Sequence, residues 1–553
     1  MSNGEKINCP LCNDKVDKLL FRFHIDSEQK VLDKIKEQNP GWTENDGCCS
    51  RCVDYYNIQI IRQERILPEV GPHFQVKSAD DFIILPTALR VDANPRFTGK
   101  GVTICFIDSG FYLHPDLTVF TNRIKITVDI TNPKQLKKYF TLPHNESWHG
   151  TMTTVVCAGD GYLSNGLYKG IASDAELVLL KVQDEDGHIT TENILKALQW
   201  VQKNYKKYGI QIINMSLGDD EEGLWKDSKV NVLAEELIEK GIAIVAAAGN
   251  TEGATIKPPA NAPNVITVGG WDDDNTLNET KKLYHSAYGK TPDELTKPEL
   301  IANAIWIAAP ILPGTKDQEE AAALYELNQC ADENIHQKLK ELIAKTQLEE
   351  TLIYQQDITI VRQNIIDRIQ ECKFISSHYM HVDGTSFAAP IVSAVIAQLL
   401  EAVPGLSPKV VRSVLFNTAK RLPGLPAERQ GFGVIHPRKA LINVIQNQTI
   451  MIPHKSPVIN TAKKTVTFYM HNSGASQISL AGSFNHWAQD VLLLEPGKNG
   501  TWKIEIPLLQ PGRYTYKFFV DEKLWTEDIE NPYREPDGFN GFNSILSIEN
   551  HLS

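Results

Sequence analysis

The sequence predicts an α/β protein in which a parallel sheet is flanked by helices, with a small cysteine-rich domain before it and a β-sandwich after it. Between residues 101 and 450, short β-branched runs alternate with helical segments, which is typical of a parallel sheet. Cysteines crowd the first tenth of the chain. From residue 455 to residue 553, alternating strand patterns are separated by Gly, Asn and Pro turns, as expected of an immunoglobulin-like sandwich.

The composition is that of a folded protein with several domains. Its 553 residues suggest about three or four domains, and 42% hydrophobic with 22% charged residues are ordinary values. The net charge of −12 argues against nucleic acid as a partner, because phosphate binding favours a basic face. No apolar run reaches about 18 residues, so we expect no membrane span and no membrane partner. The start, MSNGEKINCP, does not resemble a secretory signal.

Four parts follow one another along the chain. Residues 1–65 carry the cysteine cluster and a helical stretch, and residues 66–100 form a connector rich in Gly, Pro and Asn turn signals. Residues 101–450 form the α/β domain, and residues 455–553 form the sandwich. In the sandwich, the runs TVTFYMHN, QISLAGSF, TWKIEIPL and RYTYKFFV predict antiparallel strands.

Strand and crossover-helix patterns alternate in the α/β domain. The β-branched runs predict strands at residues 102–107, 177–182, 210–215, 242–246 and 265–268. Helical periodicity predicts crossover helices at residues 191–205 and 230–240. Residues 316–372 break this alternation with long helical patterns such as EEAAALYEL and HQKLKELIAK, and we interpret them as a helical insertion. The insertion is a lid over a cleft, a dimer contact or a surface decoration.

Three short motifs in the α/β domain carry reactive side chains. Asp108 in Ile-Asp-Ser-Gly follows a buried strand, at the end where α/β ligand sites lie. His149 precedes a glycine at the start of a predicted helix. Ser386, in DGTSFAAP, precedes the apolar helix IVSAVIAQLL, whose N–H groups point towards developing negative charge. Each motif is common alone, but the order Asp, His, Ser is that of one known catalytic triad.

On these motifs the α/β domain resembles the subtilisin-like (subtilase) serine peptidases. The segments GKGVTICFIDSGFYLHPDL, HGTMTTVVCAG, INMSLG, VAAAGN, NVITVGG and DGTSFAAPIVSAVIAQLL occur in the family's order. The resemblance implies that Asp108 orients His149, that His149 is the general base and then acid, and that Ser386 is the nucleophile. It also implies that Asn250 and the Ser386 N–H form the oxyanion hole.

The resemblance further implies that an extended substrate pairs with the segment Ser216-Leu217-Gly218. The next four residues, 219–222, are all acidic, and we interpret them as a solvated loop or as acids that favour basic substrates. Met152 stands where the family often has histidine, and no inhibitory propeptide is recognisable. Residues 80–89 are a connector or a short pro-segment lying in the cleft. Calcium sites are common in the family, but none can be matched here residue by residue.

The cysteine cluster has the spacing of a metal site. Cys9 and Cys12 form one Cys-x-x-Cys pair, and Cys49 and Cys52 form a second, separated from the first by 36 residues. Four thiolates suit a tetrahedral, structural zinc, which would stabilise a domain too small for a large core. Redox-active or unliganded thiols are the alternative, and Cys48 is an alternate ligand. Because the other cysteines are scattered singly, we expect a reduced, cytoplasmic protein.

Residues 463–549 resemble the carbohydrate-binding module of glycogen-binding and starch-branching proteins. The motifs AGSFNHW, PGRYTYKFFVD, LWTEDIENP and GFNSILSI carry this resemblance. It implies that Trp487 and Trp525 are stacking platforms for glucose rings, and that Lys517 and Asn543 bind sugar hydroxyls. The alternative is that one or both tryptophans belong to the sandwich core.

Together these features predict a serine endopeptidase that cleaves protein or peptide substrates and is tethered to an α-glucan such as glycogen. The alternative, from another functional class, is a glucan-binding scaffold whose peptidase domain is inactive or locked. Covalent labelling of Ser386 by a fluorophosphonate distinguishes the two.

Overall fold

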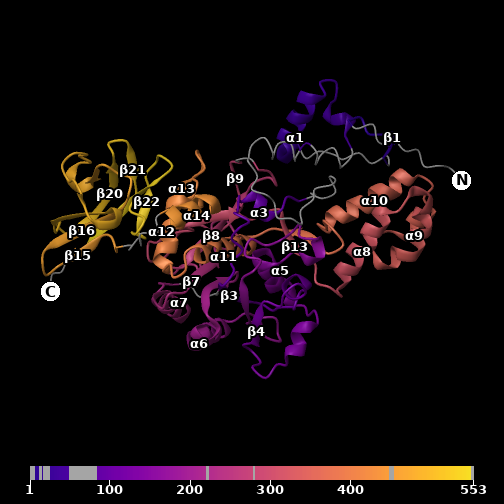
Figure 1. Ribbon diagram of the computed structural model, residues 1–553, viewed down its shortest axis with the longest axis horizontal. Coiled ribbons are helices and arrows are strands. Elements are labelled where there is room, and N and C mark those ends of the chain that lie inside the picture. The colour runs from indigo at the N-terminus through magenta and orange to yellow at the C-terminus, as the bar shows by residue number, and fades with distance from the viewer. Residues whose placement is uncertain are drawn as a thin grey trace.

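The computed structural model describes residues 7–11, 15–16, 25–48, 56, 84–218, 223–277, 280–446 and 454–549. Figure 1 shows the α/β domain at the centre, with the C-terminal sandwich at one end and the helical insertion at the other. The short described stretch near the N-terminus contains β1 (Ile7–Asn8), β2 (Lys15–Val16) and α1 (Ile25–Gln38). Three predicted zinc ligands, Cys12, Cys49 and Cys52, lie outside the described residues.

A sheet of eight strands forms the centre of the described α/β domain. Its parallel strands are, in spatial order, β12 (Leu300–Asn303), β8 (Ile266–Asp272), β7 (Ala243–Ala247), β6 (Ile210–Met215), β3 (Thr103–Asp108), β5 (Glu176–Lys181) and β4 (Ile124–Asp129). The short β9 (Lys282–Leu283) pairs antiparallel with β8. The predicted parallel sheet is therefore confirmed. Sequence patterns missed β4 and β12, since β4 is half-exposed and β12 has only four residues.

Helices cover both faces of this sheet, which explains the apolar run from Ile104 to Ile107 in β3. Ile104 and Phe106 belong to a core shared with α5 (Ser147–Ala158) and α11 (Thr385–Ala402). The alternate residues of β3 belong to a second core with α6 (Thr191–Tyr208) and α7 (Lys229–Glu239). Successive side chains of a strand point to opposite faces, so a sheet covered twice requires a continuous apolar run.

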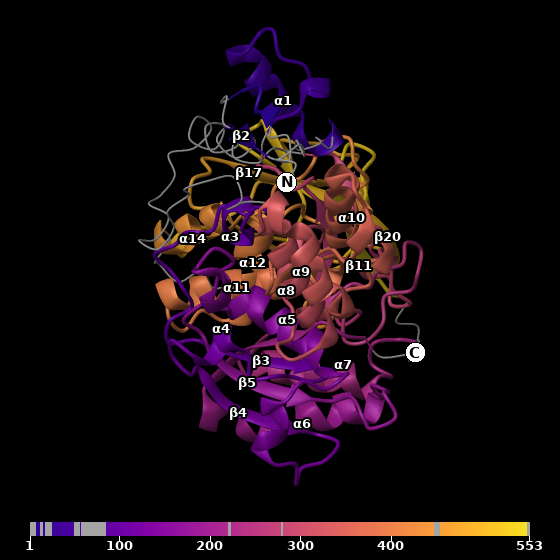
Figure 2. The ribbon, with the colours of Figure 1, turned by 90° about the vertical axis from the view of Figure 1, so that its right-hand side faces the viewer.

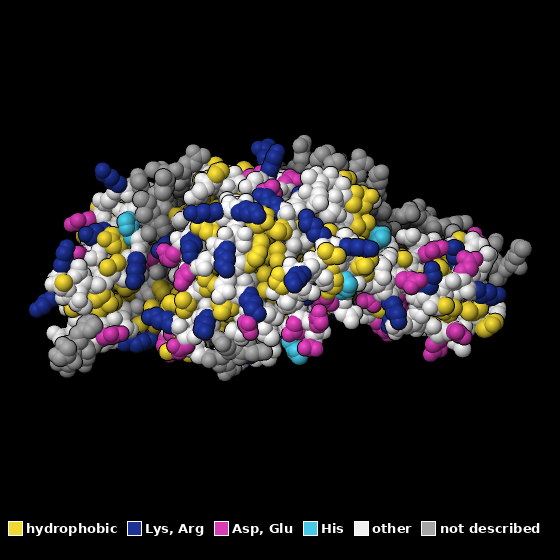
Figure 3. All heavy atoms as spheres, turned by 90° about the horizontal axis from the view of Figure 1, so that it is seen from below, with side chains coloured by type: hydrophobic (Ala, Val, Ile, Leu, Met, Phe, Trp, Pro, Cys, Tyr) yellow, Lys and Arg dark blue, Asp and Glu magenta, His cyan; other side chains and the backbone are white. Residues whose placement is uncertain are grey.

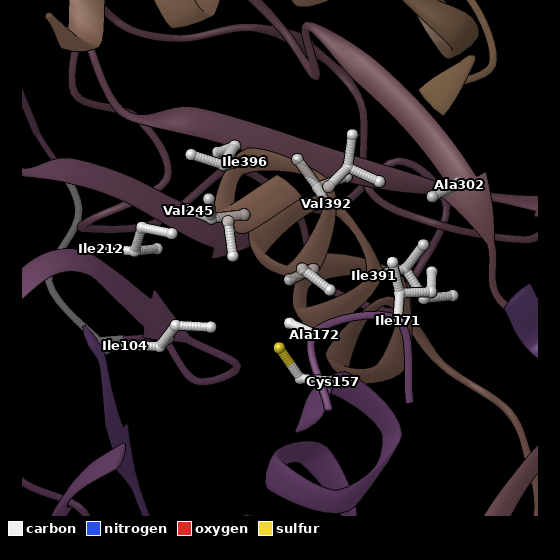
Figure 4. Close-up of a cluster of buried hydrophobic side chains, with 14 of the residues drawn as sticks. Ile104, Cys157, Ile171, Ala172, Ile212, Val245, Ala302, Ile391, Val392 and Ile396 are labelled. Carbon is white, nitrogen blue, oxygen red and sulfur yellow. The ribbon is translucent and has the colours of Figure 1, made fainter. Parts of the chain in front are cut away.

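The core helix α11 carries Ser386 in its first turn. Figure 4 shows Ile391, Val392 and Ile396 of this helix packed among side chains from the sheet and from α5. By length and composition α11 is the one helix of the described residues that is apolar enough to cross a membrane, yet 83% of it is buried inside the protein. Its apolarity is therefore that of a central core helix.

Smaller helices complete the α/β domain. These helices are α3 (Thr87–Arg90), α4 (Pro115–Thr118), α12 (Pro408–Thr418), α13 (Ala427–Gln430) and α14 (Pro437–Gln446). Of these, α12 and α13 face the sandwich. Just before α3, Ile84 and Leu85 are buried, and Ile84 packs in a cluster with Tyr168, Ala308 and Tyr379. Residues 80–83 of the candidate pro-segment lie outside the description.

The insertion forms a helical lobe with a core of its own. It consists of α8 (Lys316–Gln329), α9 (Ile335–Leu342) and α10 (Ile358–Glu371), whose apolar residues form a separate cluster. Its two flanks, β13 (Ile307–Pro310) and β14 (Tyr379–Val382), pair antiparallel, and α11 begins three residues after β14. Figure 1 shows the lobe at one end of the molecule, and in Figure 2 this end faces the viewer. The two-stranded ribbon of β13 and β14 therefore connects the lobe to α11, the helix that carries Ser386.

The C-terminal region is a sandwich of two antiparallel sheets. One contains β15 (Val458–Asn460), β16 (Thr465–His471), β19 (Thr501–Pro507) and β18 (Glu495–Pro496). The other contains β17 (Ile478–Gly482), β20 (Gly512–Val520), β23 (Phe542–Ile548), β22 (Arg534–Pro536) and β21 (Leu524–Thr526). Their inner faces enclose one apolar core. The predicted β-rich C-terminal region is thus confirmed.

The sandwich is docked on the α/β domain through a buried arginine. The Arg534 guanidinium lies between two rings, 4.1 Å from the centre of Phe432 in the α/β domain and 4.6 Å from the centre of Phe542 in the sandwich. The Arg534 backbone carbonyl accepts a hydrogen bond from the Thr296 hydroxyl at 3.0 Å. A cation held between two aromatic faces fixes the two domains against each other.

In Figure 3, basic and acidic side chains are interspersed on the face seen from below.

Candidate functional site

Asp108 and His149 form a pair at the carboxyl end of the sheet, in which Asp108 is buried and the His149 side chain is 20% exposed. Asp108 is the last residue of β3, and His149 lies in the first turn of α5. The His149 Nδ1 lies 2.6 Å from Oδ1 of Asp108, whose side chain is 1% exposed. Asp108 also accepts hydrogen bonds from the Ser109 N–H at 2.7 Å and the Thr153 hydroxyl at 3.1 Å. These bonds hold the carboxylate, so that Nδ1 of His149 donates to it and Nε2 is left as a proton acceptor.

The electrostatics of this pair favour a charged imidazole. Burial alone would lower the pKa of His149, but the charge of Asp108 and its hydrogen bond outweigh burial and raise the pKa above its ordinary value. A base whose conjugate acid is stabilised in this way accepts a proton more readily. The pair is therefore arranged to take up a proton at Nε2.

A glycine permits the close approach of α5 to β3. A Cβ built on Gly150 would lie 2.3 Å from the carbonyl oxygen of Gly110 and 2.9 Å from Cβ of Asp108. No side chain fits in that space, so the residue after His149 must be glycine for the histidine to reach Asp108. This explains the His-Gly dipeptide that sequence analysis singled out.

Ser386 lies in the first turn of α11. The ring of the next residue, Phe387, lies 6.0 Å from the His149 ring, between centroids. The Ser386 hydroxyl donates to the carbonyl oxygen of Ser216 at 3.3 Å, and the Ser216 hydroxyl donates to the carbonyl oxygen of Ser386 at 2.7 Å. The structure thus brings Ser386 and Ser216 together, and the serine hydroxyl is directed to Ser216 rather than to the imidazole.

Asn250 is held with its amide oriented towards the start of α11. Its Oδ1 accepts hydrogen bonds from both the N–H and the hydroxyl of Thr385. Its Nδ2 lies towards Gly384, 3.4 Å from where a Cβ of that glycine would be. Because Oδ1 is occupied, Nδ2 is the group that Asn250 can offer to a developing oxyanion beside Ser386.

The remaining substrate-segment residues follow β6. Ser216 is buried, whereas Leu217 and Gly218 follow it towards the surface, and the acidic residues 219–222 lie outside the described range. Sequence reasoning missed Thr153 and Thr385, which position Asp108 and Asn250. It also missed Trp148, whose indole is 48% exposed beside His149, with ring centroids 5.2 Å apart. The only sequence signal for these residues is that they lie in the same motifs as His149 and Ser386.

The four predicted sugar-contact residues line one cavity of about 580 Å³ in the sandwich. The indoles of Trp487 and Trp525 are both partly exposed, with centroids 5.9 Å apart and planes at 72°. Lys517, from β20, and Asn543, from β23, line the same space. The tryptophans are therefore placed on a cavity wall and do not belong to the sandwich core. Flat apolar rings beside hydrogen-bonding groups are the usual means of binding a sugar.

Of the predicted zinc ligands, only Cys9 lies in the described part of the chain. It is buried together with Cys48 in a small cluster with Leu32, Ile35 and Trp42. Within the described residues, no group of three or more His, Cys, Asp or Glu side chains is arranged to hold a metal ion. The cluster places Cys9 close to Cys48, the residue that precedes the second Cys-x-x-Cys pair in the sequence.

The fold and the similarity to known proteins define the class of protein. Residues 99–433, more than half of the chain, match the model of the subtilase family. The chain belongs to this family. Residues 465–552 match a second model, described as the glycogen recognition site of AMP-activated protein kinase. The sandwich is thus a module of the glycogen-recognition type.

Particular relatives are similar over the peptidase domain. Serine protease AprX of Bacillus subtilis (strain 168) is 29% identical over 330 residues, which cover 58% of this chain and 61% of that protein. Subtilisin BL of Lederbergia lenta is 28% identical over 183 residues, 33% of this chain and 60% of that protein. The chain therefore spans about three fifths of the length of these relatives. Among solved structures, Sphericase aligns with a TM-score of 0.42 at 22% identity, covering 61% of this chain and 92% of that one.

Proposed function

We propose that this protein is a serine endopeptidase that uses Asp108, His149 and Ser386 as its triad and is tethered to an α-glucan such as glycogen. The observation that carries the peptidase activity is the bond between Nδ1 of His149 and the buried Asp108, in a chain of the subtilase family. It leaves a basic Nε2 beside the helix that presents Ser386.

The reaction begins when the Ser386 hydroxyl turns from the Ser216 carbonyl towards Nε2 of His149. As Oγ bonds to the scissile carbonyl carbon, its proton passes to Nε2, and Asp108 stabilises the imidazolium. The carbonyl oxygen becomes an oxyanion that accepts hydrogen bonds from Nδ2 of Asn250 and the Ser386 N–H. Collapse breaks the C–N bond, and His149 gives the proton to the leaving amine. Water then hydrolyses the acyl-enzyme by the same steps.

Substrate is expected to lie extended along the segment that begins at Ser216. That segment continues β6 beyond the sheet, where its backbone groups can pair with a peptide strand. The reciprocal bonds between Ser216 and Ser386 tie this segment to the first turn of α11. Peptide binding and nucleophile position are thereby linked.

The experiment that tests the peptidase proposal is labelling with a fluorophosphonate, which reacts with an activated serine. We expect about one label per chain, located on Ser386, and none in Ser386→Ala. Casein hydrolysis should disappear in the same variant. A folded wild-type chain that takes up no label would overturn the proposal. That result would support the alternative, a glucan-binding scaffold with a locked peptidase domain, which the bond between the Ser386 hydroxyl and Ser216 favours.

The tether proposal rests on the cavity shared by Trp487, Trp525, Lys517 and Asn543. We expect the protein to co-sediment with glycogen, and Trp487→Ala or Trp525→Ala to weaken this by roughly tenfold, because stacking on one indole contributes about 1–2 kcal/mol. The unfolding temperature serves as the control for folding. Unchanged co-sedimentation of the double variant would contradict the assignment of both indoles to sugar.

We further propose that Cys9, Cys12, Cys49 and Cys52 bind one structural zinc ion. The burial of Cys9 beside Cys48 supports a compact thiolate cluster, and thiolate ligands suit a protein of the reducing cytoplasm. When bound, zinc would stabilise this small domain and take no part in hydrolysis. Metal analysis should find one zinc per chain and a loss of it in Cys12→Ser combined with Cys52→Ser. Full zinc content in that variant would contradict the ligand set.

A further inference from the structure

The cavity of the sandwich is lined by a residue that belongs to the peptidase domain. Nine of its lining residues come from the sandwich, and the tenth, Arg421, follows α12 of the peptidase domain. The stretch of chain from 421 to 430 lies against the loop that joins β22 to β23. In that loop, Asn540 donates to the carbonyl of Leu422 at 3.4 Å and accepts from Gln430 at 3.4 Å. The cavity therefore lies at the interface between the two domains.

The Arg421 guanidinium is fixed with part of its surface free. Nη1 and Nη2 donate to the carboxylate of Glu527, and Nε donates to the carbonyl of Gly431 at 3.4 Å. These bonds use three of the five N–H groups of an arginine. The side chain is 24% exposed. The guanidinium lies 5.3 Å from the ring centre of Phe542, whose neighbour Asn543 is a predicted sugar contact. Among the described residues, no hydrogen bond uses the other two N–H groups, and the side chain lines the cavity.

The loop between β22 and β23 of the sandwich leaves space for the Arg421 guanidinium. A Cβ built on Gly541 would lie 3.3 Å from Nη1 of Arg421 and 2.8 Å from Oδ2 of Asp537. Asp537 in turn accepts the N–H groups of Phe539 at 2.7 Å and Gly541 at 2.9 Å, so it holds the loop closed. The glycine lets the guanidinium approach the loop backbone. The rim of the cavity is thus preformed with Arg421 in place.

The charges that line the cavity are paired. Lys517 forms an ion pair with Asp537, and Arg421 forms one with Glu527. Burial alone would raise the pKa of Asp537, but the hydrogen bonds from Lys517 and the loop N–H groups lower it, which keeps the pair ionised. Two cations and two anions cancel, so the cavity favours a neutral ligand with many hydroxyl groups over a charged one. This chemistry is that of a glucan.

We propose that Arg421 of the peptidase domain is a binding residue for the α-glucan, donating hydrogen bonds to sugar hydroxyls from the wall opposite the sandwich's own residues. The glucan then contacts both domains at once. This inference rests on the proposed tether function and adds a part to it: the glucan site is complete only when the sandwich is docked on the peptidase domain. Binding and docking are therefore thermodynamically linked, and each stabilises the other.

The test measures the affinity of the full chain for maltoheptaose by titration calorimetry. In Arg421→Ala we expect an affinity loss of roughly tenfold or more, the usual effect of removing a charged hydrogen-bond donor. The matched control is Arg513→Ala, which also removes an ion-paired arginine but lies on the sandwich surface outside the cavity. Its affinity should equal that of the wild type.

A second variant separates sugar contact from a role in docking. Thr296→Ala removes a docking contact, the bond from its hydroxyl to the Arg534 carbonyl, but leaves every residue that lines the cavity in place, so affinity should stay within about twofold of the wild type. If Thr296→Ala loses as much affinity as Arg421→Ala, or if Arg421→Ala binds like the wild type, the inference is wrong. If the wild type itself does not bind maltoheptaose, the proposed tether function fails first. If Trp525→Ala loses binding while Arg421→Ala does not, only the role of Arg421 is rejected.

Discussion

Oδ1 of Asn250 accepts two hydrogen bonds from Thr385, one from its N–H at 2.9 Å and one from its hydroxyl at 2.8 Å. The same hydroxyl accepts a bond from the N–H of Gly249 at 3.2 Å. Thr385 is the residue before the proposed nucleophile, so one side chain ties the Asn250 amide to the helix that carries Ser386. This arrangement fixes the orientation of Nδ2 in advance, as the proposed oxyanion hole requires.

The first prediction concerns this threonine. Thr385→Ala removes one of the two anchors on Asn250, and we expect kcat to fall by roughly tenfold, with KM little changed. Asn250→Ala, which removes the donor itself, should cost about 100- to 1000-fold. Thr385→Ser keeps the hydroxyl and should restore most of kcat. Steady-state kinetics on a chromogenic peptide measure all three. An equal loss in Thr385→Ser and Thr385→Ala would contradict a role for the hydroxyl.

The second prediction concerns Gly150. In an ordinary helix, alanine is favoured over glycine by up to about 1 kcal/mol. Here the added Cβ would meet the Gly110 carbonyl, so Gly150→Ala should destabilise the domain by about 1–3 kcal/mol and reduce fluorophosphonate labelling. Urea unfolding and labelling measure the two effects. Gly474→Ala, where the nearest atom is 3.8 Å away, is the control. A stabilised Gly150→Ala would show that this contact relaxes freely.

The third prediction is the pH dependence of cleavage. The pKa of His149 is raised by Asp108, and the general base must be neutral, so kcat/KM should rise with pH through an apparent pKa above about 6.5. The contribution of His149 to folding stability depends on pH in the opposite direction. The protonated form is favoured by folding, so its contribution is fully present below about pH 6.5 and is lost as pH rises through the folded pKa. A pH profile with its midpoint below 6.5 would contradict this assignment.

The fourth prediction tests whether the triad acts as a unit. Ser386→Ala and His149→Ala should each remove nearly all hydrolysis, and the double variant should lose little more, since neither residue works without the other. Residual rates against casein and a small peptide measure this. Losses that multiply in the double variant would mean that the two side chains act independently.

The sequence predicted the parallel sheet because a strand covered on both faces leaves a continuous apolar run, as in β3 before Asp108. It also predicted the positions of Asp108, His149, Ser386 and Asn250, because their motifs occur in an order typical of one family. It missed β4, whose half-exposed edge position weakens the apolar pattern. Short strands such as β12 carry too few residues to show a period.

Two features were decided by the tertiary structure alone. Thr385 positions Asn250 across 135 residues of sequence, and Arg421 reaches Glu527 across 106 residues. Neither residue stands in a pattern that indicates its partner, because hydrogen bonds between distant segments depend on how helices and loops pack. The sequence of residues along the chain determined which chemical groups the protein carries. Packing of α11 on the sheet, and of the sandwich on the peptidase domain, decided which of those groups meet.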